Sequence, residues 1–328
     1  MSSIQFPSLA PDSLEPIADG LITTLGSLVP PSHAARIRSA LAGLPMSTTP
    51  SIGLEVTLPP GKSSCDLSVL LPPGITPAFA VDEAPSLTEL TREIALRSSG
   101  TVWWECDTSE KRPPLGAFIR FVDGVDAFDT VRRAAPQHSG LAEAVDHLQR
   151  LCSPFMAGDS AIVGMFPTRA PAAAAVLFHP TDLGRAVSAL SQDAVGCVDL
   201  ETPLIHHLLA TCDLFAVSVG CDVLGRVAVS AEASFKRRER AMLDRRWDAV
   251  FARPDAWGAA ATSLPSLAAV QGAHSFTGFL PWGILSGIDH IKVGPGGRVK
   301  AYVGALPFLR GVGPAGAAIT PAASTPSP

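Results

Sequence analysis

Hydrophobic and polar residues alternate in short runs along the chain, and such period-two runs predict half-buried β-strands. In residues 52–58, for example, isoleucine, leucine and valine fill every second position, while glycine, glutamate and threonine stand between them. Residues 215–220 and 227–232 repeat the alternation. Each of these strands is therefore expected to have one apolar and one polar face, with Glu55 and Glu232 on the polar faces.

The strand-like runs come in pairs, and helix-like stretches separate the pairs. The predicted strand pairs are 52–58 with 65–71, 101–106 with 116–122, 161–166 with 173–178, 215–220 with 226–235, and 288–293 with 298–308. The predicted helices cover about residues 11–29, 32–44, 125–133, 140–152, 182–190, 204–211, 239–251 and 266–270, and one more begins at a capping box of Ser86 and Glu89. This order makes about five helix–helix–strand–strand units, of which the second has one clear helix.

Five antiparallel pairs make ten strands, and closure of such a sheet removes its exposed edges. We therefore predict an α+β fold: a ten-stranded antiparallel β-barrel of about five ααββ repeats, with helices outside and the polar faces in the lumen. An open antiparallel sheet with its polar face in water is the alternative. The barrel would be a single domain over residues 1–310. Residues 311–328, uncharged and rich in Ala, Pro, Ser and Thr, are predicted to be a disordered tail.

The composition excludes several classes of protein. Hydrophobic residues make up 47% of the 328 residues and charged residues 17%, which is enough apolar mass for a large core. A net charge of -5 argues against an overall basic nucleic-acid binder. No run reaches the roughly 18 apolar residues of a membrane helix, and residues 1–31 lack the Lys and Arg of a secretory signal. The six scattered cysteines then indicate reduced thiols in a cytoplasmic protein, rather than disulfides or a zinc site.

Two motifs carry a resemblance to a known family. Glu55 lies in Gly-Leu-Glu-Val-Thr on an early strand, and Lys300-Ala301-Tyr302 lies on the last strand. Together with the repeated element order, they resemble the ABBA barrel of the aromatic prenyltransferases, the group of the dimethylallyltryptophan synthases and cyanobactin prenyltransferases. The resemblance implies that Glu55 accepts a hydrogen bond from an indole N–H, that Lys300 binds diphosphate and that Tyr302 shields an allyl cation.

The resemblance also implies a reaction, the metal-independent transfer of a prenyl group from an allylic diphosphate to an indole-like small molecule or peptide. The chain has no D-D-x-x-D motif of a metal-dependent terpene enzyme, so we expect neither a metal nor another cofactor. Lysine and arginine side chains would then have to meet the charge of the diphosphate.

The final hairpin contains two of the chain's five lysines. If its loop is the three residues 295–297, Lys292 pairs with Lys300 and His290 pairs with Tyr302, and all four side chains share one face. A four-residue loop would divide them between the two faces. The alternative to a binding site is that the two lysines are simply exposed to solvent on an edge hairpin.

Two arginines complete the predicted diphosphate site. Arg120 stands between apolar neighbours in the predicted strand 116–122, where a buried arginine is costly unless it is paired or faces a wet cavity. A structural pairing with Glu105 or Glu232 is the alternative. The predicted diphosphate ligands are Arg120, Arg169, Lys292 and Lys300, with Arg298 as a further candidate. The predicted lining on the acceptor side is Trp103, Glu105, Glu232 and His290, although a large aromatic residue also suits a plain core.

Two other functions stay open at the level of sequence. One is a non-catalytic barrel that binds a protein or peptide partner in a biosynthetic pathway, which the single tyrosine of the chain favours. The other is an isoprenoid cyclase on the same barrel, in which an Asp or Glu would protonate an alkene. A lumen with several converging basic groups would favour an enzyme, and a filled lumen would favour a binding module.

Overall fold

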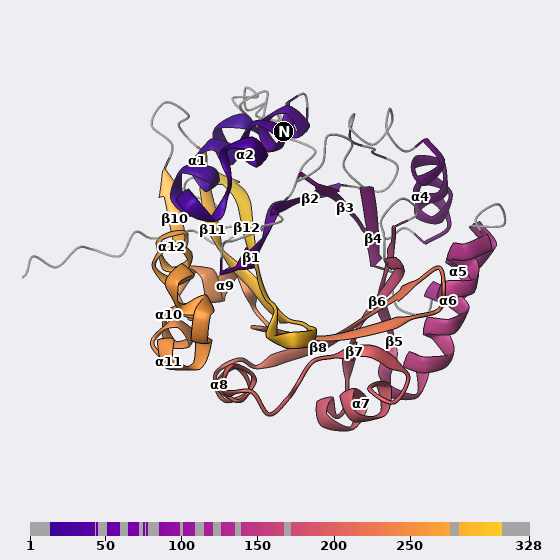
Figure 1. Cartoon of the computed structure of the whole chain (residues 1–328). Helices are drawn as coiled ribbons and strands as arrows, with labels where there is room; N and C mark the ends of the chain where they lie inside the picture. The colour runs from indigo at the N-terminus through magenta and orange to yellow at the C-terminus, as the bar shows by residue number, and fades with distance from the viewer. Residues whose placement is uncertain are drawn as a thin grey trace, which may run out of the picture.

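Ten antiparallel strands close into a ring in the computed structural model of the chain, and the helices lie outside the ring (Figure 1). The structure describes residues 14–42, 44, 51–59, 65–71, 75, 77, 85–98, 101–108, 115–120, 126–134, 139–166, 172–275 and 282–309. The first strand of the ring pairs with the last, and this pairing closes the barrel. The predicted ten-stranded barrel is therefore confirmed, and the open sheet is excluded.

The strands of the ring lie close to their predicted positions. In order around it they are β1 (Ser51–Leu58), β2 (Cys65–Leu71), β3 (Thr101–Asp107), β4 (Leu115–Arg120), β5 (Met156–Met165), β6 (Ala172–Pro180), β8 (Leu214–Asp222), β9 (Val227–Ser234), β11 (Trp282–Val293) and β12 (Val299–Leu309). Two short strands were not predicted, because four residues are too few to show a period. β7 (Ala194–Cys197) runs parallel to the start of β9, and β10 (Gly272–Ser275) runs antiparallel to β11.

The helices precede the strand pairs in the predicted order. They are α1 (Glu15–Leu25), η1 (Gly26–Leu28), α2 (Pro31–Leu41), α4 (Pro85–Ser98), α5 (Ala127–Ala134), α6 (Ser139–Cys152), η3 (Ser153–Phe155), α7 (Leu183–Leu190), α8 (Pro203–Thr211), α9 (Arg238–Leu243), α10 (Trp247–Phe251), α11 (Pro254–Trp257), η4 (Gly258–Ser263), α12 (Leu264–Ala269) and η5 (Pro295–Gly297). The single helix predicted over residues 239–251 was wrong. It is divided into α9 and α10, because Arg245 between them has a φ of 51°, which no right-handed helix contains.

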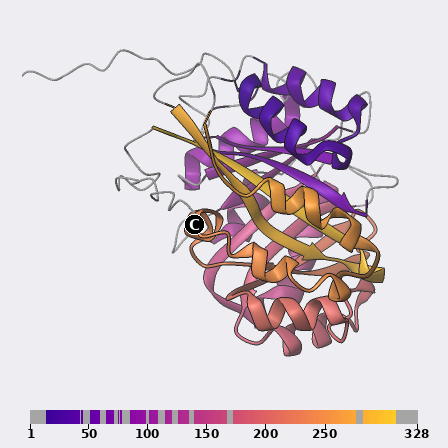
Figure 2. The same ribbon diagram turned by 90° about the vertical axis from the view of Figure 1, so that its left-hand side faces the viewer.

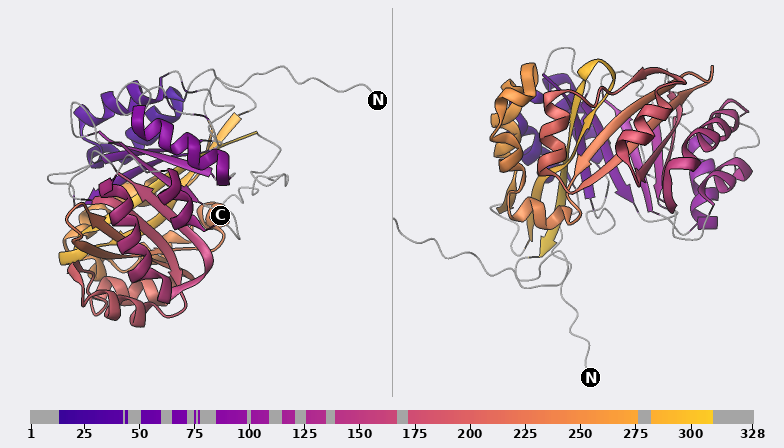
Figure 3. Two further views of the ribbon diagram at one scale, coloured as in Figure 1. Left: turned by 90° about the vertical axis from the view of Figure 1, so that its right-hand side faces the viewer. Right: turned by 90° about the horizontal axis from the view of Figure 1, so that it is seen from below.

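The described helices flank the barrel on several sides (Figure 1). Figure 2 shows the orange helices α9 to α12 beside the long yellow hairpin of β11 and β12, with the indigo helices α1 and α2 above them. Figure 3 shows the purple and magenta helices α4, α5 and α6 over the side formed by β4, β5 and β6. Within the described residues, no helix combines the length and the apolar character needed to cross a membrane.

The two faces of the strands differ in burial. On β1, Leu54 and Val56 are fully buried and belong to one apolar cluster with helix residues such as Leu25 and Ile37. This face points outward, because the helices lie outside the ring. The residues between them, Glu55 among these, therefore point into the lumen.

Two further predictions concern the cysteines and the tail. None of the six cysteines forms a disulfide; five are buried and Cys197 is partly buried. Burial raises the pKa of five of these thiols, for example to about 12 at Cys152, so these five are protonated near neutral pH. The predicted tail, residues 311–328, lies outside the described residues.

Candidate functional site

The hairpin of β11 and β12 brings four polar side chains to one wall of the lumen. Its loop turns at residues 296–297, two glycines with φ of 67° and 71°, a left-handed conformation that glycine adopts without strain. The resulting register pairs Lys292 with Lys300 and His290 with Tyr302. The predicted three-residue loop is confirmed, and the four side chains share the inward face.

Glu55 accepts hydrogen bonds from two residues of β12. Lys300 Nζ forms an ion pair with its Oε1, and the Tyr302 hydroxyl donates to the carboxylate. Burial would raise the pKa of Glu55, but these two partners, with Lys292 nearby, lower it to about 2. Glu55 is therefore an anion at neutral pH, and it is not the proton donor that an isoprenoid cyclase needs.

The same contacts keep Lys300 charged and Tyr302 protonated. Burial would lower the pKa of Lys300, but the carboxylates of Glu55 and Asp66 raise it above its usual value. The pKa of Tyr302 lies well above its usual value, because the phenol is buried and faces Glu55 and Glu232. Lys300 is thus an ammonium group and Tyr302 a hydrogen-bond donor throughout the physiological range.

Glu232 of β9 joins the second lysine to the histidine. Its Oε1 lies 3.2 Å from Lys292 Nζ, and its Oε2 lies 3.5 Å from His290 Nε2. Lys292 Nζ also donates to Ser218 Oγ of β8 at 2.8 Å. The His290 ring stacks on Tyr302 with ring centroids 3.8 Å apart and 21° between the planes. One continuous polar wall therefore extends from β8 through β9, β11 and β12 to β1.

Three carboxylates from neighbouring strands meet beside Lys300. One oxygen each of Glu55, Asp66 and Glu105 lies within 4.8 Å of the others, and all three residues are buried. Carboxylate oxygens suit a hard cation such as Mg²⁺ or Ca²⁺, so these three could hold one. The Lys300 ammonium already supplies positive charge at this place, because it is paired with Glu55 and attracted by Asp66 and Glu105.

Apolar side chains line the inward face on the other side of the ring. Trp103 pairs with Phe118 across β3 and β4, and Ile162 pairs with Leu177 across β5 and β6; all four are partly exposed. Trp103 therefore lies on the lumen side, as predicted for a lining residue, while its neighbour Trp104 is buried on the outward face. The lumen thus has a polar and an apolar side.

Two glycines make room for aromatic rings on this apolar side. The rings of Phe118 and Phe166 pack edge to face, with centroids 5.1 Å apart. A Cβ atom at Gly164 would lie 2.6 Å from the Phe118 ring, and one at Gly116 would lie 2.4 Å from the Phe166 ring. Only glycine fits at these two positions without displacement of a ring.

Arg120 lies on a different part of the wall from the two lysines. In the described part of β4, the side chain of Arg120 is exposed to water, so it needs no buried partner. Glu232, one of its two suggested partners, contacts Lys292 instead. Arg298 is exposed in the hairpin loop, and Arg169 lies outside the described residues.

Three residues of the polar network were not singled out from the sequence. Asp66 and Ser218 occupy polar positions in alternating runs, so their inward orientation was readable from the pattern. Asp289, which contacts His290, is the extra residue where the pairing of β11 and β12 shifts register. No period in the sequence indicates such a bulge.

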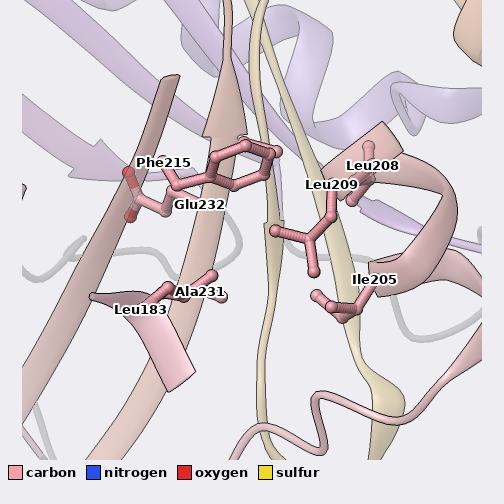
Figure 4. Close-up of a pocket in the computed structure, with 8 residues that line it drawn as sticks. Leu183, Ile205, Leu208, Leu209, Phe215, Ala231 and Glu232 are labelled. Carbon is pink, nitrogen blue, oxygen red and sulfur yellow. The ribbon is translucent and has the colours of Figure 1, made fainter. Parts of the chain in front are cut away.

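A small apolar pocket lies outside the barrel wall, between helix α8 and strands β8 and β9 (Figure 4). Its open volume is about 200 Å³, including the space at its mouth, and leucine, isoleucine and phenylalanine side chains line it. Glu232 borders it, but its carboxylate points away from the apolar side chains of α8 (Figure 4). The pocket is therefore separate from the polar network of the lumen.

No model of a known protein family matches the chain, and no curated protein sequence matches it significantly. The geometry and charge of the lumen are therefore the guide to function.

Proposed function

We propose that the chain transfers a prenyl group from an allylic diphosphate to an electron-rich aromatic acceptor inside the barrel, without a metal ion. The observation that carries this proposal is the convergence of Lys292, Lys300, Tyr302 and Glu55 on one wall of the lumen. Their neighbours keep both an ammonium group and a carboxylate in charged form at this wall.

The two lysines are proposed to bind the diphosphate. The side chains of Lys292 and Lys300 are 23% and 29% exposed, so an anion in the lumen can reach them. As the allylic C–O bond breaks, negative charge grows on the leaving oxygens. Fixed ammonium groups stabilise that charge more strongly in the transition state than in the bound substrate.

Glu55 is proposed to bind the acceptor. An ionised, buried carboxylate is a strong acceptor for an N–H or O–H group, and such a hydrogen bond raises the electron density of the attached ring. Positive charge that develops on the allyl carbon is stabilised by the same carboxylate and by the ring face of Tyr302. The apolar side of the lumen, with Trp103 and Phe118, suits the hydrocarbon of the prenyl group.

A second candidate function is a barrel that binds a cationic partner without catalysis. On the described strands, inward-facing carboxylates outnumber inward-facing lysines and arginines: Glu55, Asp66, Glu105, Asp107 and Glu232 against Arg120, Lys292 and Lys300. Both lysines are already paired with a glutamate. A lumen of this charge attracts an amine or a basic peptide.

A turnover assay tests the proposed reaction. The full chain is incubated with dimethylallyl or geranyl diphosphate and a panel of indoles and phenols, with EDTA present. The expected product is an acceptor heavier by one prenyl group, formed with release of diphosphate and lost in Lys300→Met. Lys236→Met, which removes an exposed lysine, is the matched control. No product from any acceptor, together with binding of a basic peptide that Glu55→Gln abolishes, would favour the second candidate.

A further inference from the structure

A row of polar contacts along β11 connects helix α9 with the wall of the lumen. Arg238 Nη1 of α9 lies 2.7 Å from Asp289 Oδ2, and the same oxygen lies 2.8 Å from His290 Nδ1. On the lumen side, His290 Nε2 lies 3.5 Å from Glu232 Oε2. Neither Arg238 nor Asp289 takes part in the proposed binding of the diphosphate and the acceptor.

A β-bulge makes this row possible. The pairing of β11 and β12 shifts register between Ile288 and His290, so Asp289 is an extra residue on β11. In a regular strand, Asp289 and His290 would point to opposite sides of the wall. The bulge instead lets the carboxylate reach both Arg238 of α9 and the imidazole ring beside it.

The contacts fix which nitrogen of His290 faces the lumen. Burial would raise the pKa of Asp289, but the hydrogen bond from His290 and the charge of Arg238 lower it, so Asp289 is an anion that only accepts hydrogen bonds. His290 Nδ1 therefore carries the proton of their hydrogen bond, and Nε2 is directed to the lumen. Stacking on Tyr302 fixes the plane of the ring. An aspartate holds a histidine base in this way in the Ser-His-Asp triad.

The imidazole ring lies one side chain away from Glu55, the residue proposed to bind the acceptor. His290 stacks on Tyr302, whose hydroxyl donates to Glu55. An aromatic ring held by Glu55 would thus be bound one side chain away from the imidazole. Proton removal from the acceptor requires a base at such a place.

We propose that His290 is the general base of the reaction and that Asp289 and Arg238 are positioning residues; this inference rests on the proposed prenyl transfer. In that reaction the allylic C–O bond breaks, and its electron pair leaves with the diphosphate. A π electron pair of the acceptor ring forms the new C–C bond. His290 Nε2 then takes the proton from the attacked ring carbon, and the electron pair of that C–H bond restores the aromatic ring. The imidazolium formed lies between the carboxylates of Asp289 and Glu232.

Steady-state kinetics of His290→Gln test the base. We expect kcat to fall about 100-fold, the usual contribution of a general base, while the KM for the prenyl diphosphate stays close to that of the wild type. An acceptor deuterated at the attacked carbon is expected to show a primary isotope effect in the variant, because proton removal becomes slow. His206→Gln, which changes an exposed histidine of α8, is the matched control.

Chemical rescue separates catalysis from folding. In His290→Ala, added imidazole is expected to restore much of the lost activity, while geranyl thiolodiphosphate binds as in the wild type. Asp289→Asn is expected to lose less activity than His290→Gln and to show part of the same isotope effect. A merely structural role of Asp289 would lower the melting temperature without any isotope effect.

The possible failures are distinguishable. If the wild type turns over but His290→Gln keeps full kcat, or if imidazole restores nothing to a folded His290→Ala that binds the analogue, the base assignment is overturned and prenyl transfer stands. If the wild type forms no product with any acceptor, prenyl transfer and the base assignment fail together.

Discussion

Lys300 and Glu55 form an ion pair across the seam of the barrel, where the last strand meets the first. The two residues are 245 positions apart in the sequence. The pair is diagonal, because the backbone register sets Glu55 opposite Tyr302 and Lys300 opposite Thr57. This contact both joins the ends of the sheet and places an ammonium group beside the carboxylate that is proposed to bind the acceptor.

Loss of the lysine is expected to leave a buried charge. Lys300→Met removes the partner of Glu55, and we expect it to lower the free energy of unfolding by about 3 kcal/mol. Glu55→Gln combined with Lys300→Met should regain part of this loss, because no lone carboxylate then stays buried at position 55. Urea denaturation measures both, and Lys236→Met is expected to have almost no effect. A double variant no more stable than Lys300→Met alone would refute the coupling.

The stability of the barrel is expected to depend on the ionisation of Glu55. Its pKa is about 2 in the folded chain and about 4.5 without its partners, so the folded state binds the proton more weakly. The stabilisation by Glu55 is therefore complete above pH 4.5 and is lost as the pH falls towards 2. In Glu55→Gln this part of the pH dependence should vanish. The prediction fails if the difference in unfolding free energy between the wild type and Glu55→Gln stays constant from pH 6 to pH 3.

The turn between β11 and β12 is expected to require glycine. Gly297 has a φ of 71°, so Gly297→Ala should cost about 1 kcal/mol of stability, and Gly297→Asn should cost less. Gly294→Ala in the same loop is the control, because its φ is -106° and its new Cβ would make only ordinary contact with Ser230. Equal effects of the alanine substitutions at positions 294 and 297 would argue against this turn and the register that follows from it.

The aromatic side of the lumen is expected to resist added methyl groups. A Cβ at Gly164 would lie 2.6 Å from the Phe118 ring, so Gly164→Ala should destabilise the chain by roughly 1–3 kcal/mol. A Phe118→Leu substitution should relieve much of this cost. Gly140→Ala on helix α6 is the control and should not destabilise the chain. Its Cβ makes only ordinary contacts, and alanine favours helices more than glycine does. Thermal unfolding of Gly164→Ala, Phe118→Leu, the variant with both substitutions and Gly140→Ala gives the comparison, and a neutral Gly164→Ala would contradict the packing.

The barrel could be predicted from the sequence because its strands must bury every second side chain. The alternation at Leu54, Glu55 and Val56 already separates the helix-covered face from the lumen, and ten such strands favour closure. The short strands β7 and β10 could not be predicted, since they form only where a longer strand offers an edge. The break at Arg245 accompanies a contact with a distant segment, since its guanidinium donates to the carbonyl oxygen of Ala268 in α12 at 3.4 Å.

Part of the site could also be predicted, and the limits have physical causes. The pairing of Lys292 with Lys300 follows from the length of one loop, which is local information. Arg120 is exposed although its sequence neighbour Ile119 is fully buried, because successive residues of a strand point to opposite faces. The contact of Asp289 with His290 depends on a bulge in β11. The contact of Lys300 with Glu55 depends on closure of the whole ring. The residues near each contact in the sequence therefore do not predict it.

The central claim is that the lumen binds an allylic diphosphate without a metal, and a calorimetric titration with geranyl thiolodiphosphate in EDTA tests it most directly. We predict micromolar binding that Lys300→Met and Lys292→Met weaken strongly, that Lys236→Met leaves unchanged, and that added Mg²⁺ does not improve. Absence of binding, or binding that appears only with Mg²⁺ and needs the carboxylates of Glu55, Asp66 and Glu105, would contradict the account.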